Sequence, residues 1–474
     1  MGKKMTFDLQ SLELLETYEF NVIVEDGKER FAGKLNLAPE KTTITIMGEQ
    51  HNERKCSIGW DNLSQLTCTD INKKFFLYDL RLCRARNSSI SRHPKSIGYF
   101  EAVFEVGFVV FCPFDVYEDN FVESINIHSE AINDWVGNTV TQENILSYYR
   151  NKKPLFNYAG ALDEFVVGID GVGTLGVPYN LSMHVSSLDF KSGILFPPSL
   201  LMHFNRCVDA EEMKRLYDKI YNLISFLVGN DVLVSKVDIG CGGLRFSNSG
   251  SLYYSSRSFR PKYNDGVTLF PLGKDLRFDS LGLPSMPLGI FNNYFSLSDT
   301  EIEYWGKYLK YKRMNNVEER FLGYFRLLEA LVFKQKSYLD EAVLANLCEK
   351  SKAYLIRKFD DEKNVKRFLR GVPRYNKSKY NTEKCIQDFY ELMPVELSSK
   401  WKFKKCDIGG MCKLRNDITH ANEYYESEGE IEGKTKFIES LLVLALCLKL
   451  GVDLKVSVEF IYRISGYQLI ASTE

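Results

Sequence analysis

YEFNVIVEDGKERFAGKLNL, residues 18–37, alternates apolar and polar side chains on both sides of an Asp26-Gly27 pair. Such alternation is typical of β-strands with one buried face, and Asp-Gly is typical of a tight hairpin turn. The stretches TTITIMG, KFFLYDLRL and YFEAVFEVGFVVFC repeat the pattern downstream. Several short strands with turn residues between them predict an antiparallel sandwich or barrel in the N-terminal half.

A helical stretch interrupts these strands. DAEEMKRLYDKIYNLISFLVGN, residues 209–230, has an acidic first turn and closes on Gly229-Asn230, so it predicts a helix near 209–228. The Pro- and Gly-rich LGLPSMPLGIF, residues 281–291, is typical of a domain boundary. The sequence therefore predicts a β-rich region over residues 1–295.

The remainder, residues 296–474, has a helical period. Ser298 and Glu301 have the spacing of a capping box, and a long apolar stripe follows them. The stripe consists of Val317, Phe321, Tyr324, Leu328 and Leu331. The predicted fold class is therefore α+β and multidomain: a β-rich antiparallel N-terminal half followed by an all-α helical bundle.

Composition sets limits on compartment and partners. The chain has 474 residues, a formal net charge of −1 and 11 cysteines without a CxxC pair. Scattered cysteines favour a reducing cytoplasm, and MGKKMTFDLQ has no apolar core of a secretory signal. The longest apolar run, LLVLALCL at 441–448, is too short to span a bilayer and predicts a buried helix. We expect a cytoplasmic protein with no membrane partner.

No metal or cofactor is expected. Cys406 and Cys412 lack zinc-ligand spacing and nearby histidines. GVGTLG, residues 171–176, fits a dinucleotide-binding pattern, but Pro178 follows at once and no helix opens there. The interpretation of GVGTLG is a glycine-rich hairpin or loop.

KLRNDITHAN, residues 413–422, contains the strongest functional candidates. Arg415, Asn416 and His420 lie on a predicted helix, and His420 is the last of six histidines. Asn416 and His420 share a helix face, whereas Arg415 lies about 140° around the axis from His420. One helix would therefore have difficulty focusing both groups on one atom. Two copies of the helix across a two-fold axis could do so, which points to a composite site in a homodimer.

An imidazole and a guanidinium support a specific chemistry. The imidazole can take or give a proton near neutral pH, and the guanidinium can bind a phosphate and stabilise developing charge. Together they suit metal-free RNA cleavage in which the ribose 2′-OH is the nucleophile. The alternative is that His420 caps a helix C-terminus and Arg415 is solvated.

RNDITH resembles the R-N-x-x-x-H signature of the HEPN superfamily. A β-rich N-terminal half, with FAGKLNL and then TTITIMG, before a terminal HEPN domain resembles the ApeA-type anti-phage defence proteins. The resemblance implies a helical bundle that dimerises and cuts RNA without metal. It also implies that Arg415 and His420 are the catalytic pair and that Asn416 orients them.

Glu329 is a further candidate because it lies between Phe325 and Phe333 in an apolar stripe. An unpaired buried carboxylate is costly, so Glu329 needs a partner, and Arg415 or His420 is suitable. The resemblance adds that HEPN domains often carry an acidic residue on an early helix. The alternative is an edge position, where Glu329 reaches solvent or a lysine.

Two basic segments are candidates for RNA contact. RKFDDEKNVKRFLRGVPRYNKSK, residues 357–379, interleaves cations with aromatic rings, as unpaired RNA binding requires. The second segment leads into the RNDITH motif and contains Lys402, Lys404, Lys405 and Lys413. The alternative for both is a solvated helix face. The predicted RNA-binding residues are Arg367, Arg370, Arg374, Lys404, Lys405 and Lys413.

The leading hypothesis is a metal-independent endoribonuclease of an abortive-infection system. Its C-terminal domain would cut RNA as a homodimer, with tRNA as a candidate substrate. The N-terminal region would sense a phage-encoded trigger, an expectation that rests on the resemblance. The alternative is a non-catalytic HEPN module that binds nucleotides or partner proteins as a scaffold.

Overall fold

The structure is a computed structural model in which contacts divide the chain into two compact units, Met1–Ile302 and Glu303–Glu474. No helix within the described residues has both the length and the apolar composition needed to cross a bilayer. The structure describes residues 10–26, 29–50, 61–90, 97–113, 121–151, 158–186, 191–241, 248–256, 268–273, 276, 278–377 and 381–465.

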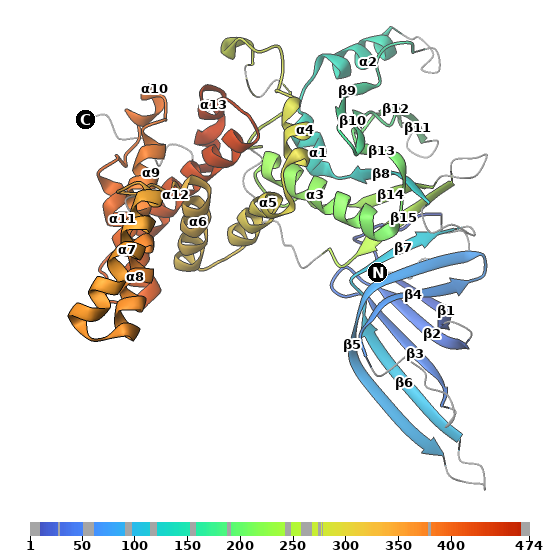
Figure 1. Ribbon diagram of the computed structural model, residues 1–474. Helices are drawn as coiled ribbons and strands as arrows, with labels where there is room; N and C mark the ends of the chain where they lie inside the picture. The colour runs from blue at the N-terminus through green and yellow to red at the C-terminus, as the bar shows by residue number, and fades with distance from the viewer. Residues whose placement is uncertain are drawn as a thin grey trace. The chain divides into compact units, whose positions relative to one another are not determined.

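The first unit begins with six strands that close into an antiparallel ring (blue to cyan in Figure 1). Their order is β4-β1-β2-β3-β6-β5, and a further pairing of β4 with β5 closes the ring. Of the two predicted alternatives, sandwich or barrel, this part is a barrel. The strands are β1 (Tyr18–Asp26), β2 (Glu29–Leu37), β3 (Thr43–Gln50), β4 (Leu63–Asp70), β5 (Lys73–Ile90) and β6 (Ile97–Glu105).

The hairpin that the sequence predicted is formed by β1 and β2. Tyr18 pairs with Leu37 at one end and Asp26 with Glu29 at the other, and Gly27 of the predicted turn lies outside the described residues. Along β1 the side chains alternate between buried and exposed, from buried Phe20 to exposed Asn21 and on. The buried alternate side chains line the barrel core, as period-two alternation requires.

The sheet continues beyond the ring through β7-β15-β14-β8-β13-β10-β9. These strands are β7 (Phe108–Cys112), β8 (Val122–His128), β9 (Asp163–Ile169), β10 (Gly173–Pro178), β13 (Leu200–Val208), β14 (Lys236–Cys241) and β15 (Asn248–Tyr254). A separate pair comprises β11 (Ser182–Ser186) and β12 (Lys191–Leu195). The helices of this unit are α1 (Glu130–Val136), α2 (Val140–Arg150), α3 (Ala210–Val228), the 3-10 helix η2 (Asp279–Leu281) and α4 (Gly289–Ser296).

Helix α3 occupies the stretch where the sequence predicted a helix. Asp209 caps its N-terminus by accepting from the Glu212 backbone N–H, and Gly229 ends it in the left-handed conformation. GVGTLG forms the turn between β9 and β10 and the first residues of β10, and Gly171 in this turn has φ +72°. A Cβ on Gly173 would lie 1.8 Å from the carbonyl oxygen of His203, so glycine is required there by close strand packing.

The second unit is an all-α bundle, in agreement with the predicted fold class. The apolar run at 441–448 lies in α12, which is buried through most of its length and packs on α6. Helix α5 (Asp299–Lys312) contains the division between the two units. The other helices are α6 (Val317–Val332), α7 (Glu341–Phe359), α8 (Glu362–Asn376), α9 (Thr382–Tyr390), α10 (Val395–Ser398), α11 (Asp407–His420), α12 (Glu428–Lys449) and α13 (Leu454–Ser465).

A buried carboxylate joins three helices of this bundle. Glu439 of α12 is 8% exposed and accepts hydrogen bonds from Tyr308 of α5 (2.9 Å) and Tyr324 of α6 (3.3 Å). The Lys312 ammonium lies 3.2 Å from the same oxygen. Burial, followed by the charge of Glu439, raises the pKa of both tyrosines, so their hydroxyls stay protonated donors.

We expect Glu439→Ala to destabilise the second unit by about 3 kcal/mol, because it leaves a half-buried ammonium and two buried hydroxyls without their acceptor. The melting temperature of this unit should fall by roughly 6–10 °C in differential scanning calorimetry. Glu459→Ala, which removes an exposed carboxylate on α13, is the control and should change the melting temperature little. An equal effect of both substitutions would contradict the assigned role of Glu439.

Candidate functional site

Helix α11 carries the RNDITH motif as its last two turns. Asp407 is the first residue of the helix, and its carboxylate accepts from the Lys404 backbone N–H at 2.7 Å, which fixes the turn before the helix. The helix ends at His420 because Ala421 adopts a left-handed conformation at φ +54°. The Asn422 backbone N–H then donates to the Asp417 carbonyl at 2.9 Å. The motif is therefore held on a helix with defined ends.

Arg415 forms an ion pair with Glu329 of α6. The Nη2 atom of Arg415 lies 2.6 Å from Oε2 of Glu329, and the two side chains are 27% and 29% exposed. Nη1 donates to the amide oxygen of Asn416 at 2.9 Å. The guanidinium also lies over the Phe325 ring, with its carbon 5.6 Å from the ring centre. The partner that Glu329 needs is thus Arg415.

The second oxygen of Glu329 has its own donor. Oε1 accepts a hydrogen bond from the hydroxyl of Thr382, the first residue of α9. The carboxylate is therefore held from two helices, and it fixes the guanidinium of Arg415 in turn. Within the described residues, Nε of Arg415 is buried without a hydrogen-bond partner. The orientation of the guanidinium is set while part of its donor capacity remains unused.

His420 lies apart from this cluster. It is exposed at the last position of α11, and within the described residues no hydrogen bond or ion pair joins it to Arg415, Asn416 or Glu329. The five-residue separation gives the expected angle of about 140° around the helix axis. One copy of the chain thus brings together Arg415, Asn416 and Glu329 but leaves His420 open to solvent.

The nearby thiol of Cys412 is not a candidate nucleophile. Burial, followed by the charge of Glu383, raises its pKa to about 12, against a smaller opposing effect of Arg415. A thiol with that pKa stays neutral at physiological pH and is a poor nucleophile. Among the described residues, no group of three or more His, Cys, Asp or Glu side chains is arranged to hold a metal ion.

The predicted RNA-binding residues divide into two groups. Arg367, Arg370 and Arg374 are exposed on α8, and Lys413 is exposed on α11. By contrast, Lys404 donates to the carbonyls of Ser398 and Ser399, at 3.0 and 2.8 Å, and Lys405 pairs with Glu391. Lys404 and Lys405 therefore fix the end of α10 and the approach to α11.

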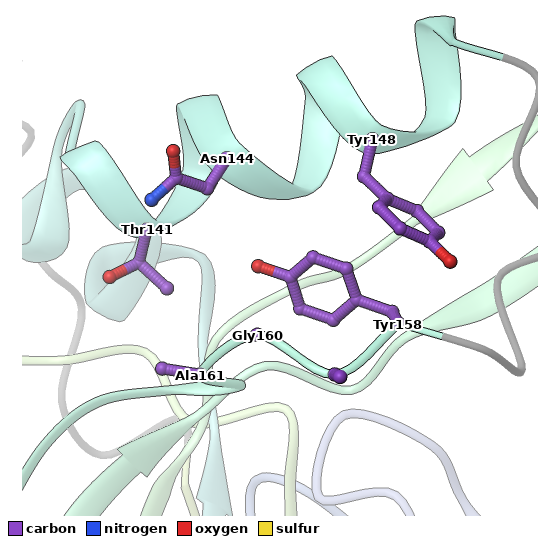
Figure 2. Close-up of a pocket in the computed structure, with 7 residues that line it drawn as sticks. Thr141, Asn144, Tyr148, Tyr158, Gly160 and Ala161 are labelled. Atoms are coloured by element: carbon purple, nitrogen blue, oxygen red, sulfur yellow. The ribbon is translucent and has the colours of Figure 1, made fainter.

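A shallow hollow in the first unit is a weaker candidate. Its volume is about 370 Å³, and it lies between α2 and residues 158–161. Figure 2 shows Tyr148 and Tyr158 beside it, with ring centres 5.1 Å apart. None of the described residues that line it carries a charge. The hollow therefore offers hydroxyl and amide groups but no ionised side chain to a ligand.

Sequence reasoning missed two members of the cluster around Arg415. Phe325 was identified only as part of an apolar stripe, and Thr382 was not identified. Phe325 lies one helical turn before Glu329, so its position below an Arg415–Glu329 pair was in principle accessible from the spacing. Thr382 gave no local signal, because its contact depends on how α9 packs against α6.

We expect Arg415 and Glu329 to be coupled by about 1–2 kcal/mol. This value lies between those of exposed and buried ion pairs, because both side chains are partly exposed. A double-mutant cycle with Glu329→Ala and Arg415→Ala, followed by urea unfolding, measures the coupling. The exposed Glu362–Lys366 pair of α8 is the control and should give less than about 1 kcal/mol. Additive effects of the Glu329 and Arg415 substitutions would contradict the pairing.

Comparison with known proteins assigns the family. The family model described as ApeA N-terminal domain 1 matches residues 16–279, which is more than half of the chain. The model described as Apea-like HEPN matches residues 322–456, which include Glu329 and all of α11. No curated protein and no solved structure gave a match. The chain therefore belongs to the ApeA-type family of HEPN anti-phage defence proteins.

Proposed function

We propose that the second unit is a metal-independent endoribonuclease that acts as a homodimer. The observation that carries the proposal is the Arg415 guanidinium, oriented by Glu329 and Asn416 on the helix that ends in His420. Phosphodiester transfer needs a cation that binds the phosphate and a group that exchanges a proton, and α11 carries an oriented guanidinium and an exposed imidazole. The cytoplasm, where RNA is plentiful, is the compartment in which such an enzyme would act.

The proposed reaction is an internal transesterification. The ribose 2′ oxygen forms a bond to phosphorus while the bond from phosphorus to the 5′ oxygen breaks. His420 takes the proton from the 2′-OH or gives one to the leaving 5′ oxygen, and water makes the other proton transfer. Arg415 binds the phosphate and stabilises its added negative charge. The products are a 2′,3′-cyclic phosphate and a 5′-OH end.

A second copy completes the proposed site. In one copy, Arg415 faces Glu329 of α6 whereas His420 is exposed at the end of α11. Two α11 helices across a two-fold axis would bring His420 of one copy toward Arg415 of the other. The imidazole and the guanidinium of one site would then come from different copies, so their angle of about 140° on a single helix would no longer keep them apart.

The basic side of α8 is the proposed path for RNA. Arg367, Arg370 and Arg374 lie two, five and nine residues after buried Val365, so they cluster on the side of α8 away from α7. None of the three forms an ion pair with a described carboxylate. Lys413, exposed on α11 beside the motif, would extend this path toward the site. tRNA is the candidate substrate.

The first unit is the proposed sensor. A nuclease that cuts host RNA must be silent before infection, so a phage-encoded trigger would act through this unit. The match of an ApeA N-terminal domain to residues 16–279 supports the assignment.

The second candidate function is a non-catalytic scaffold that binds nucleotides or proteins. The separation of His420 from the Arg415–Glu329 pair within one copy favours it. In that case Arg415 would bind a phosphate without cleavage.

We expect His420→Ala and Arg415→Ala each to lower cleavage of total RNA by at least about a hundredfold, since each removes a group that acts on the transferring phosphate. Wild-type activity should survive EDTA, and 3′-end sequencing should detect cyclic phosphates. His203→Ala, an exposed histidine of β13, is the matched control and should retain activity. Cleavage that persists in both site variants would show that the pair is wrongly assigned. Intact RNA with wild type and a phage trigger would favour the scaffold.

We expect Arg370→Ala to weaken RNA binding by the His420→Ala protein and to make binding less salt-dependent. Removal of one cation that binds a phosphate of single-stranded RNA should reduce the slope of log K against log salt by about 0.7. Lys455→Ala, an exposed cation of α13, is the control and should leave the slope unchanged. Fluorescence anisotropy at several salt concentrations measures both slopes. Equal slopes with and without the Arg370 substitution would exclude a phosphate contact at Arg370.

A further inference from the structure

Helices α7 and α8 form a hairpin that extends from the rest of the second unit (orange in Figure 1). Its base is pinned because the Asn376 amide pairs with the backbone of Leu339 in both directions, at 2.8 and 3.0 Å. These bonds join the start of α7 to the end of α8, so the two helices run antiparallel. Leu344 and Val365 are the buried apolar residues of these two helices.

Large apolar side chains are exposed along both helices at matching positions. On α7, Leu347 and Tyr354 lie three and ten residues after Leu344. On α8, Phe368 and Tyr375 lie three and ten residues after Val365. Each of these four side chains, together with Val343, is more than half exposed.

Both stripes lie on the same side of the hairpin. Offsets of three and ten residues turn a side chain by about 300° and 280°, a similar angle from the buried position on each helix. Because the helices are antiparallel, the same rotation from the shared inner side directs both stripes to one face. We call this surface, made by Val343, Leu347, Tyr354, Phe368 and Tyr375, the apolar face. Exposed apolar patches of this kind mark interaction surfaces.

We infer that the apolar face binds the same face of a second copy of the chain. The inference deepens the proposed function, because it names a surface that holds the homodimer together. RNA is the less suitable occupant, since Arg367, Arg370 and Arg374 lie about 80–160° around α8 from its exposed apolar side chains. An apolar stripe pairs best with another apolar stripe.

The charges of α7 fit a two-fold arrangement. The helix begins with Asp340 and Glu341 and ends with Arg357 and Lys358. Consider a two-fold axis that lies in the interface and runs perpendicular to the helix axes. It makes the two α7 helices antiparallel, so the acidic start of each α7 meets the basic end of the other. A surface that is complementary to itself in this way is the requirement for an isologous dimer.

The size of the apolar face indicates that it is one part of the interface. Two helices side by side, each roughly 10 Å wide and about 20 Å long, cover about 400 Å² in plan. A stable complex usually buries about 800 Å² per partner. The hairpin would therefore act together with the proposed pairing of α11.

The test is the molar mass of the full chain, measured by light scattering after size exclusion over a range of concentrations. We expect wild type to be dimeric and Leu347→Glu to raise the dimer dissociation constant at least tenfold. Ala345→Glu adds the same charge about 160° around α7 from Leu347, two residues before it, and should remain dimeric. Leu347 is already exposed, so its replacement should leave the fold intact.

A mixing experiment tests whether the apolar face of one copy contacts the apolar face of the other. Leu347→Glu and Leu347→Lys chains should each dissociate alone and should associate when mixed. A wild-type mass of 54.7 kDa at all concentrations would overturn the inference, and so would a fully dimeric Leu347→Glu chain. If Leu347→Glu weakened RNA binding at unchanged mass, the face would bind RNA instead. The molar mass does not depend on catalysis, so this test distinguishes failure of the dimer interface from failure of the proposed nuclease function.

Discussion

The arrangement of the second unit around its motif depends on the ion pair between Arg415 and Glu329. This pair joins α11 to α6, and the Thr382 hydroxyl joins the same carboxylate to α9. A guanidinium alone on a helix surface samples many rotamers, whereas one held by a carboxylate and placed over an aromatic ring presents its remaining N–H groups in a fixed direction. The pair also reduces the net positive charge at the site, so an incoming phosphate must compete with Glu329. Orientation is therefore gained at some cost in phosphate affinity.

Local sequence patterns predicted most of the strands and helices, but they did not predict that the first six strands close into a barrel. Alternation in β1 and β2 and the turn residues between them specify a hairpin from neighbouring residues alone. The pairing of β1 with β4 and of β3 with β6 joins segments far apart in the sequence, and no local pattern encodes it. For this reason the sequence left a sandwich and a barrel equally open. The helical unit was more accessible, because its buried stripe on α6 repeats with a clear period.

The site was predictable where an energetic need was visible in the sequence. Glu329 in an apolar stripe needed a partner, and Arg415 is that partner. Lys404 and Lys405 were predicted to bind RNA from charge alone. In the structure Lys404 donates to two backbone carbonyls and Lys405 pairs with Glu391, contacts that the sequence did not indicate, and RNA binding by either lysine stays a prediction. Charge clusters in a sequence cannot distinguish cations that serve the fold from those that remain available to ligands.

Strand β5 has a mechanical consequence for the first unit. Its 18 residues, about 60 Å when extended, pair with β4 and β6 in the ring and with β7 in the open sheet. Residues 74–78 pair with β4 on one edge and with β7 on the other, so the ring and the open sheet share one strand. The ring and the open sheet should consequently lose their structure in a single cooperative transition, and a force applied to one would be felt along the length of the other.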